Sequence, residues 1–473
     1  MVFNDLREFI SALERDGDLH RITVPVDREW EVGALCREVA DRNGPALLFE
    51  RVGGFSTPLV TGVLGTRMRY GKALGVGPEI SAISQRWEQA YSCPIPPREV
   101  SEAPCKESVI REVNFFKDPF PVPRWHHLDG KYMLGTYHAV ITQDPESGWI
   151  NMGTYRNAIF EPDILGCSSS PRRHLWQHWN KYKAMGRPMP IAIAIGLDPY
   201  LALVTVSAVP PGIGDYSIAG GLKRAPIDIV KAETSDLLVP ARAEMIIEGE
   251  MPTDKTYESS DGPFGEFAGY MGGSRPRHRY IVAKVVTHRQ NPIFQGTYEG
   301  RAPNESTTVR ATGGSMGLKQ FLQKSGIPGV VDACVTEGGC GTFHAVVSIQ
   351  KSYPGQVQDI FSLVWGMPTL SVKLCTVVDD DVDPWNPQKV EWALATRVQA
   401  GRDVEIIRHG RGLALDPSKP PSNSLRSDKM GIDATKPEFE YSLEKSEFPS
   451  SADPTKEHLE QVRDRWTEYG FRF

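Results

Sequence analysis

The chain has 473 residues, more than one hydrophobic core usually organises, so we expect two or three domains. Hydrophobic residues make up 40% and charged residues 24% of the chain, proportions that are ordinary for a globular protein. The formal net charge of -6 argues against a broad surface for nucleic acid or anionic membrane.

The sequence also bears on cellular compartment. No apolar run is long enough to span a bilayer, and the first residues lack a basic region followed by an apolar core. The seven cysteines are odd in number and form no Cys-x-x-Cys pair, so we predict reduced thiols and neither a disulfide framework nor a zinc site. These features together predict a cytoplasmic protein.

The N-terminal region alternates helical and extended patterns. Apolar residues recur at helical spacing from Leu6 to Leu13, and Gly17 then ends the predicted helix. A strand over residues 20–26, a helix over 31–40 and a strand over 46–49 follow. This alternation predicts an α/β region.

The rest of the chain divides at two proline-rich stretches that we interpret as extended linkers. The middle region reads as a β-barrel or sandwich with one helix, and from about residue 315 a second α/β unit begins. We expect residues 417–455 to form an arm without a core of its own, before a last helix over 456–466. The linkers are 94–97 and 119–123, the middle strands 137–142, 191–196, 243–248 and 280–286 with a helix near 174–184, and the later elements a helix over 317–323 and strands over 329–331 and 345–349.

A turn at residues 261–266 places two carboxylates, Asp261 and Glu266, around the sequence Gly-Pro-Phe-Gly. A carboxylic acid held near apolar groups has a raised pKa and can exchange protons near neutral pH. Arg156, brought beside it, would tune that pKa and could hold an anionic substrate. Taken alone, the hexapeptide favours a β-turn with two solvated acids. Its interpretation as a site depends on partners elsewhere in the chain.

Asn151, His174 and Asp215 are candidate metal ligands. An amide oxygen, an imidazole and a carboxylate suit a divalent ion such as Mn²⁺ or Mg²⁺, with a phosphate completing the shell. Their spacing does not require that they meet, and a single histidine on a helix is more often packed or solvated.

Two further segments invite a ligand-binding interpretation and favour a structural one. The acidic run at 379–383 lacks EF-hand spacing, so we predict a solvated turn. The glycine-rich stretch at 337–341 lacks the phosphate-loop and dinucleotide patterns, so we predict a structural turn before a strand. No His-Glu-x-x-His motif occurs.

Seven segments in order resemble the UbiD-type decarboxylases, which use prenylated FMN. The resemblance runs from Leu6 to about Arg397, and each segment is modestly specific by itself whereas the ordered set is strongly so. The segments are Asn151 to Arg156, the His174 segment, Pro210 to Gly221, Val230 to Pro240, Asp261 to Glu266, Gly300 to Glu305, and Asp379 to Arg397.

The resemblance implies an α+β multidomain fold. An N-terminal α/β domain over 1–120 would precede a middle split β-barrel of the flavin-reductase type over 121–310, which would bind prenylated FMN. A C-terminal α/β oligomerisation domain with a terminal arm and helix would occupy 311–473. We therefore expect a homodimer or a higher homo-oligomer such as a hexamer, supplied with cofactor by a UbiX-type flavin prenyltransferase.

The resemblance also implies the site residues, position by position. Asp215 and Asp261 stand where the family usually has glutamate, so each carboxylate arm is one methylene shorter, which puts metal affinity and the link to Arg156 in question. The implied catalytic residues are Arg156, Asp261 and Glu266; the cofactor-binding residues are Asn151, Thr154, Arg156, Arg173, His174, Ser207, Val209 and Pro210; the Mn²⁺ (or Mg²⁺) ligands are Asn151, His174 and Asp215; and the K⁺ residues are Met152, Val206, Ser207, Val209 and Asp215.

The implied activity is reversible, non-oxidative decarboxylation of an aromatic or heteroaromatic carboxylic acid, with CO₂ as the other product. Loss of CO₂ from an sp² carbon leaves an electron pair that no side chain can delocalise, so a cofactor must act as electron sink. Glu266 would then donate the proton, with Arg156 and Asp261 setting its pKa and orientation. The alternatives are a cinnamate-type decarboxylase of α,β-unsaturated acids and a non-catalytic flavin-binding protein, against which the intact Arg156 and Glu266 argue.

Overall fold

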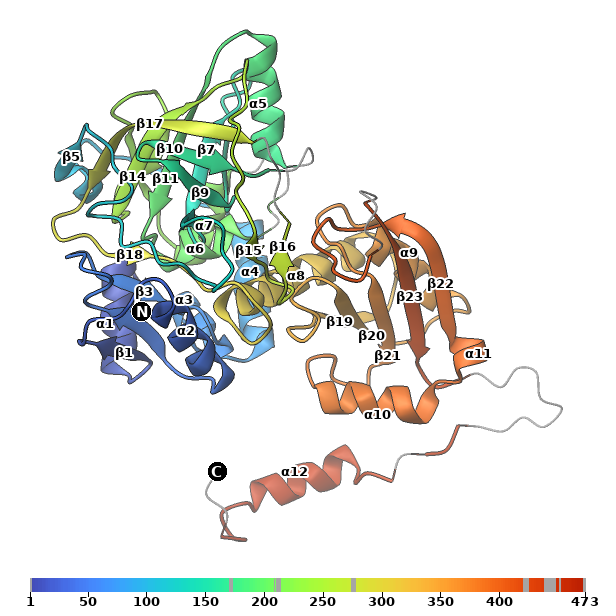
Figure 1. The fold of residues 1–473 in the computed structure, drawn as a ribbon. Coiled ribbons are helices and arrows are strands. Elements are labelled where there is room, and N and C mark those ends of the chain that lie inside the picture. The colour runs from blue at the N-terminus through green and yellow to red at the C-terminus, as the bar shows by residue number, and fades with distance from the viewer. Residues whose placement is uncertain are drawn as a thin grey trace.

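The computed structural model describes residues 2–169, 173–207, 209, 214–273, 278–419, 425–437, 448–450 and 452–470. It shows a mixed α/β architecture with three sheet-containing parts (Figure 1). The N-terminal and middle parts lie on one side of the long helix α8 (Glu305–Lys324), and the C-terminal sheet lies on the other (Figure 1).

The N-terminal part is a four-stranded sheet with helices against it. The predicted helices near 6–13 and 31–40 and the strand at 46–49 are confirmed, whereas the strand predicted over 20–26 ends at Ile22. Pro25 has no N–H to donate to a ladder, which explains the early end. The elements are α1 (Leu6–Arg15), β1 (Leu19–Ile22), α2 (Glu31–Asp41), β2 (Ala46–Phe49), β3 (Leu59–Thr61), α3 (Arg67–Leu74) and α4 (Ile80–Ser92), with β18 (Phe294–Gln295) completing the order β1-β2-β3-β18.

The middle part contains a nine-stranded sheet in which β5 pairs with β17 outside the order β6-β9-β10-β17-β14-β11-β7-β8. All four predicted strands and the helix over 174–184 are confirmed within a few residues. The strands are β5 (Ser108–Ile110), β6 (Met133–Gly135), β7 (Ala139–Gln143), β8 (Ile150–Gly153), β9 (Asn157–Glu161), β10 (Ile164–Cys167), β11 (Met189–Ile195), β14 (Met245–Met251) and β17 (Arg279–His288), and the helices are α5 (His174–Ala184), α6 (Pro199–Thr205) and α7 (Asp215–Lys223).

The connection between β8 and β9 requires this sheet to curl. Strand β8 is one end of the sheet order and β9 is next to the other end, yet only residues 154–156 join them. Three residues span at most about 11 Å, so the two ends must approach each other and the sheet forms a half-barrel. Strand β11 reads Ile-Ala-Ile-Ala-Ile over residues 191–195, and its isoleucines and alanines lie in two different cores.

Smaller elements complete the middle part. A three-stranded sheet has the order β13 (Leu238–Pro240), β12 (Asp228–Lys231), β4 (Arg98–Glu99), and η1 (Pro104–Lys106) is a short 3-10 helix. A two-stranded ribbon pairs β15 (Phe264–Gly265) with β16 (Met271–Gly272).

The C-terminal part is a five-stranded sheet covered on both faces. Helices α8 and α9 pack on one core and α10 on another. The strands are β19 (Val330–Val335), β20 (His344–Ile349), β21 (Leu374–Asp379), β22 (Val404–Arg411) and β23 (Arg426–Ala434) in the order β19-β20-β21-β23-β22, and the remaining helices are α9 (Gln356–Gly366), α10 (Pro387–Arg397), α11 (Ala400–Asp403) and α12 (Lys456–Asp464).

One expectation for this part is wrong. The stretch 417–455 is not an arm throughout, because β23 lies between β21 and β22 inside the sheet. Its charged residues conceal it: Lys429 is buried and donates to the Val372 carbonyl at 2.5 Å. The predicted last helix is confirmed as α12, which lies apart from the sheet (Figure 1). The predicted domain boundary at 310–311 falls within α8, and the domain limits stay predictions.

Both segments expected to be structural turns have structural roles. The glycine-rich stretch 337–341 connects the antiparallel strands β19 and β20. In the acidic run, Asp380, Asp381 and Asp383 are exposed, as predicted for a solvated turn, and Asp379 and Asp381 also contact the buried Arg397 guanidinium at 2.9 Å.

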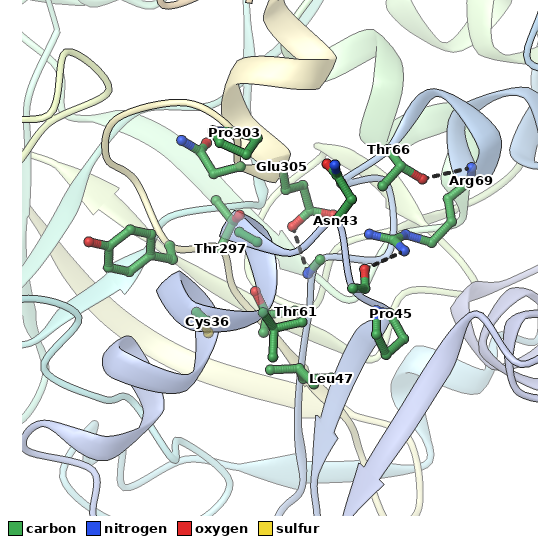
Figure 2. A pocket seen from close by; sticks show the side chains of 17 residues that line it. Cys36, Asn43, Pro45, Leu47, Thr61, Thr66, Arg69, Thr297, Pro303 and Glu305 are labelled. Carbon is green, nitrogen blue, oxygen red and sulfur yellow. Dashed lines mark hydrogen bonds between the residues drawn. The ribbon is translucent and has the colours of Figure 1, made fainter.

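A cavity of about 50 Å³ lies where the N-terminal part meets the start of α8 (Figure 2). Glu305 is buried beside it and accepts hydrogen bonds from the Gly62 and Leu64 amides at 3.0 and 2.7 Å. Burial raises the pKa of the Glu305 carboxyl. None of the lining residues is a predicted site residue, so we interpret this cavity as part of the joint between α3, β3 and α8.

The seven cysteines are free thiols, as predicted. Across the residues that the structure describes, no helix is both long enough and apolar enough to cross a membrane.

Glu244 ties the N-terminal helix to the middle sheet. Its fully buried carboxylate binds the Arg7 guanidinium through two bonds of 2.8 Å and accepts from the Ile293 amide at 3.0 Å. Replacing Glu244 with Ala removes the buried carboxylate partner of Arg7 and the acceptor of the Ile293 amide, so we expect the free energy of unfolding to fall by about 3 kcal/mol. Urea unfolding of both proteins measures it. The exposed pair Lys231–Asp236 is the control, and Asp236→Asn should leave the transition unchanged. Equal effects of the two substitutions would contradict this role.

Candidate functional site

The crossing from β8 to β9 positions Arg156. His138 holds this segment, because its Nε2 lies 3.0 Å from the Tyr155 carbonyl and 2.8 Å from Asn157 Oδ1. The Thr154 hydroxyl donates to the His138 carbonyl at 2.9 Å. Burial lowers the pKa of His138 to about 4, so the imidazole is neutral at pH 7. These contacts fix the crossing, residues 154–156, between the two approaching ends of the curled sheet, and we call this segment the strap.

The ribbon β15–β16 positions Glu266, the first residue after β15. The Glu266 amide donates to the Tyr270 carbonyl at 3.0 Å, and the Gly269 amide donates to the Glu266 carbonyl at 2.8 Å. Gly269 has φ +82°, and a Cβ there would lie 2.8 Å from Arg301 Cβ, so this tight turn requires glycine. Gly265 is held by its amide, which donates to Asp129 Oδ1 at 3.1 Å.

Arg156 lies between the two carboxylates of the predicted site. Its Nη2 and Nε donate to Asp261 Oδ2 at 2.7 and 3.2 Å, and its Nη1 donates to Glu266 Oε1. Asp261 is 2% exposed and Glu266 is 9% exposed. His278 Nε2 lies 3.1 Å from Asp261 Oδ1. The two acids of the hexapeptide and the upstream arginine thus form one buried cluster.

The surroundings shift the pKa values of the two carboxyl groups in opposite directions. Burial alone would raise the pKa of Asp261, but the hydrogen bond to His278 and the charge of Arg156 outweigh it and lower that pKa to about 2. Burial also raises the pKa of Glu266, and the Arg156 charge only partly offsets it, so the net pKa stays raised. The cluster therefore contains one acid that stays ionised and a second acid that holds its proton to higher pH than an ordinary glutamate does.

A second polar group lies on strand β8, just before the strap begins. Asn151 Oδ1 is 3.0 Å from His174 Nδ1, and the Met152 amide donates to Asp215 Oδ2 at 2.7 Å. Asn151 and Met152 are consecutive residues of β8, whereas His174 and Asp215 begin helices α5 and α7. The two helix starts thus bring the predicted imidazole and carboxylate ligands to the strand that carries the amide.

The chemistry of this group suits a divalent cation. Asp215 is 5% exposed, and burial raises its pKa to about 7 because the Met152 amide compensates only partly. Burial, followed by the nearby Arg173 charge, lowers the pKa of His174, which keeps the imidazole neutral and able to bind a metal. No cluster of three or more His, Cys, Asp or Glu side chains with metal-ligand geometry occurs among the described residues. A cation here would therefore need Asn151 and a ligand from outside the chain.

The remaining predicted residues lie around this group. The Thr154 amide donates to the Thr205 carbonyl at 3.3 Å, which places the strap beside the end of α6. Val206 and Ser207 follow α6, the Val209 amide donates to the Ser207 carbonyl at 3.1 Å, and Arg173 precedes α5. Pro210 lies outside the described residues.

Several residues around the cluster were missed from the sequence. His278 reaches Asp261 because its backbone pairs with Tyr257. Asp129 holds Gly265, and His126 contacts Asp129 at 3.1 Å. Glu299 lies close enough to Glu266 to raise its pKa. These residues stand in no motif with 261–266, and only the tertiary fold brings them together.

Models of one protein family match most of the chain. The matches are to the N-terminal domain of 3-octaprenyl-4-hydroxybenzoate carboxy-lyase over residues 10–87, its Rift-related domain over 98–302 and its C-terminal domain over 307–434. A phenolic acid decarboxylase of Sedimentibacter hydroxybenzoicus is 35% identical over 460 residues, 92% of each chain.

Solved structures agree with this match over nearly the whole length. The vanillic acid decarboxylase of Sedimentibacter hydroxybenzoicus in its closed form is 32% identical, with a TM-score of 0.87 over 98% of this chain and 99% of that one. An evolved dimeric form of the UbiD-class enzyme HmfF from Pelotomaculum thermopropionicum, in complex with prFMN, is 32% identical, with a TM-score of 0.81 over 96% of this chain and 100% of that one. The chain belongs to the UbiD family of carboxy-lyases.

Proposed function

We propose that this chain is a prenylated-FMN-dependent decarboxylase of an aromatic or heteroaromatic carboxylic acid, in which Glu266 exchanges the proton. The observation that carries the proposal is the buried cluster in which Arg156 contacts both Asp261 and Glu266. The similar phenolic and vanillic acid decarboxylases support an aromatic acid as substrate.

The reaction exchanges CO₂ for a proton at one carbon. The bond between the ring carbon and the carboxylate breaks, CO₂ leaves, and a proton from Glu266 ends on that carbon. When bound, the prenylated flavin supplies the electron sink that no side chain can provide. In the reverse direction, Glu266 accepts the proton and CO₂ is taken up. Reversibility follows because one carboxyl group can serve as acid or base.

Arg156 serves the reaction in two ways. Its guanidinium keeps Asp261 ionised and fixes the position of the Glu266 carboxyl. Its charge also favours an anionic substrate beside it. The 21% exposure of the Arg156 side chain leaves part of the guanidinium accessible. Burial of both acids excludes water that would otherwise exchange protons with the site.

Asn151, His174 and Asp215 would hold Mn²⁺ or Mg²⁺, and the cofactor phosphate would complete the shell. Met152, Val206, Ser207 and Val209 would hold K⁺ beside it. The cation would supply positive charge for the phosphate at β8, and Arg156 lies five residues after Asn151 along the chain. An origin of the cofactor in a UbiX-type prenyltransferase and a homo-oligomeric assembly complete the proposal.

Cofactor dependence is the first expected outcome. Protein purified without a flavin prenyltransferase should be inactive, whereas protein co-expressed with one should release CO₂ from some of a panel of phenolic, pyrrole, furan, indole and phenazine acids. Cinnamic acids in the same panel test the α,β-unsaturated alternative, and product analysis distinguishes the two. Full turnover by protein holding only unmodified FMN would be incompatible with this proposal, and no turnover by any loaded protein would favour a non-catalytic flavin-binding role.

Metal retention is the second expected outcome. His174→Ala would remove one proposed ligand and should lower the Mn²⁺ and flavin contents together, because the ion would help to hold the cofactor phosphate. Asp215→Glu should retain both, since it restores the longer arm usual in the family. Metal analysis and flavin absorbance measure the two quantities. The matched control is His178→Ala on the same helix, where His178 contacts Thr142 at 3.0 Å. Unchanged occupancy in His174→Ala would exclude the ligand role.

Proton transfer by Glu266 is the third expected outcome. Glu266→Gln keeps the size and hydrogen bonding of the side chain but cannot exchange a proton, so turnover should fall by at least about a hundredfold. Cofactor content should not change. Deuterium exchange into the product ring, followed by NMR, measures the step directly. Asp261→Asn should have a smaller effect if Asp261 only orients Arg156. Exchange at the wild-type rate in Glu266→Gln would mean that another group carries the proton.

A further inference from the structure

Glu299 connects to both residues that flank Glu266 in the chain. On one side, the Glu299 carbonyl lies 2.5 Å from His126 Nε2. His126 Nδ1 in turn lies 3.1 Å from Asp129, whose Oδ1 accepts the Gly265 amide at 3.1 Å. The backbone of Glu299 is thus linked through two side chains to the residue before Glu266.

On the other side, the Glu299 carboxylate is linked through Arg310 to Phe267, the residue after Glu266. Its Oε1 accepts from the Ser306 hydroxyl at 2.9 Å and lies 3.6 Å from Arg310 Nη2. The Arg310 guanidinium lies over the Phe267 ring, 4.6 Å from its centroid, and its Nε donates to Ser306 at 3.2 Å. Phe267 is 1% exposed, so the ring is a fixed support.

Charged groups approach Glu266 from four separate segments. Arg156 comes from the strap, Asp261 from the preceding turn, Glu299 from the segment after β18, and Arg310 from α8. His126 and Asp129, from the loop before β6, contact the backbone of Glu299 and Gly265, respectively. The Tyr270 carbonyl accepts the Glu266 amide at 3.0 Å.

We propose that Glu299 and Arg310 are positioning residues for Glu266: they hold its two neighbours in the chain and bring one charge of each sign near its carboxyl group. This inference rests on the proton-transfer role proposed above for Glu266. Neither residue needs to contact the substrate. The Glu299 charge favours the protonated acid, and the Arg310 charge favours the carboxylate.

The test is the titration of the Glu266 carboxyl in protein without cofactor. Infrared spectra over a pH series, taken as the difference between the wild type and Glu266→Gln, isolate the band of this one group. Glu299→Gln keeps an amide oxygen for Ser306 and should move the midpoint to lower pH. Arg310→Gln should move it to higher pH. Each variant is compared with the same variant carrying Glu266→Gln.

Two conservative variants separate charge from packing. Glu299→Asp and Arg310→Lys keep the charges, so their midpoints should stay close to that of the wild type even if their thermal stability falls. In active protein, the fall of kcat on the alkaline side should shift to lower pH in Glu299→Gln and to higher pH in Arg310→Gln. Midpoints that do not move, or that move in the same direction in both charge-removing variants, would overturn the proposal. The infrared titration decides even if no substrate is ever turned over.

Discussion

The site depends on one guanidinium enclosed between two carboxylates. Taking a charge out of water costs several kcal/mol, and a buried arginine is tolerated only where acids and hydrogen bonds repay that cost. Arg156 meets this condition with Asp261 and Glu266, and its own pKa stays raised because the two acids outweigh the effect of burial. The same arrangement gives the two acids different pKa values. Asp261 also has a hydrogen bond to His278 and stays ionised, whereas Glu266 has a raised pKa.

The curl of the middle sheet makes this enclosure possible. Because three residues join its two ends, the backbone of the strap is held at both sides, by β8 and by β9. Asn151 and Arg156 then have fixed places five residues apart, one beside His174 and the other beside Glu266. Helix α8 adds support from outside the sheet, since Glu305 at its start binds the N-terminal part and Arg310 lies on Phe267. All three parts of the chain therefore contribute to the position of one carboxyl group.

Local patterns in the sequence predict helices and strands well, but they do not predict which distant residues come into contact in the fold. Apolar periodicity located α1 because this helix buries one face, and the alternation in β11 reflects two cores. It missed β23, whose Lys429 is buried although lysine usually marks an exposed position. The pairing of Arg156 with residues 261–266 came from a resemblance over ordered segments, since no spacing rule joins positions 105 residues apart. His278, Glu299 and Arg310 have no motif and become visible only in the fold.

The balance of charge favours a protonated Glu266 when an anionic substrate enters. Arg156 and the ionised Asp261 neutralise each other, so a deprotonated Glu266 adds one uncompensated negative charge in a buried place. A substrate carboxylate would add a second, and like charges in a site of low dielectric repel strongly. A proton on Glu266 removes the first of these charges. CO₂ leaves as a neutral molecule, so in the proposed reaction the negative charge stays in the site until the Glu266 proton reaches the ring carbon. Proton transfer from Glu266 would then move this charge from the ring carbon to a carboxylate that already contacts Arg156, where an opposite charge compensates it.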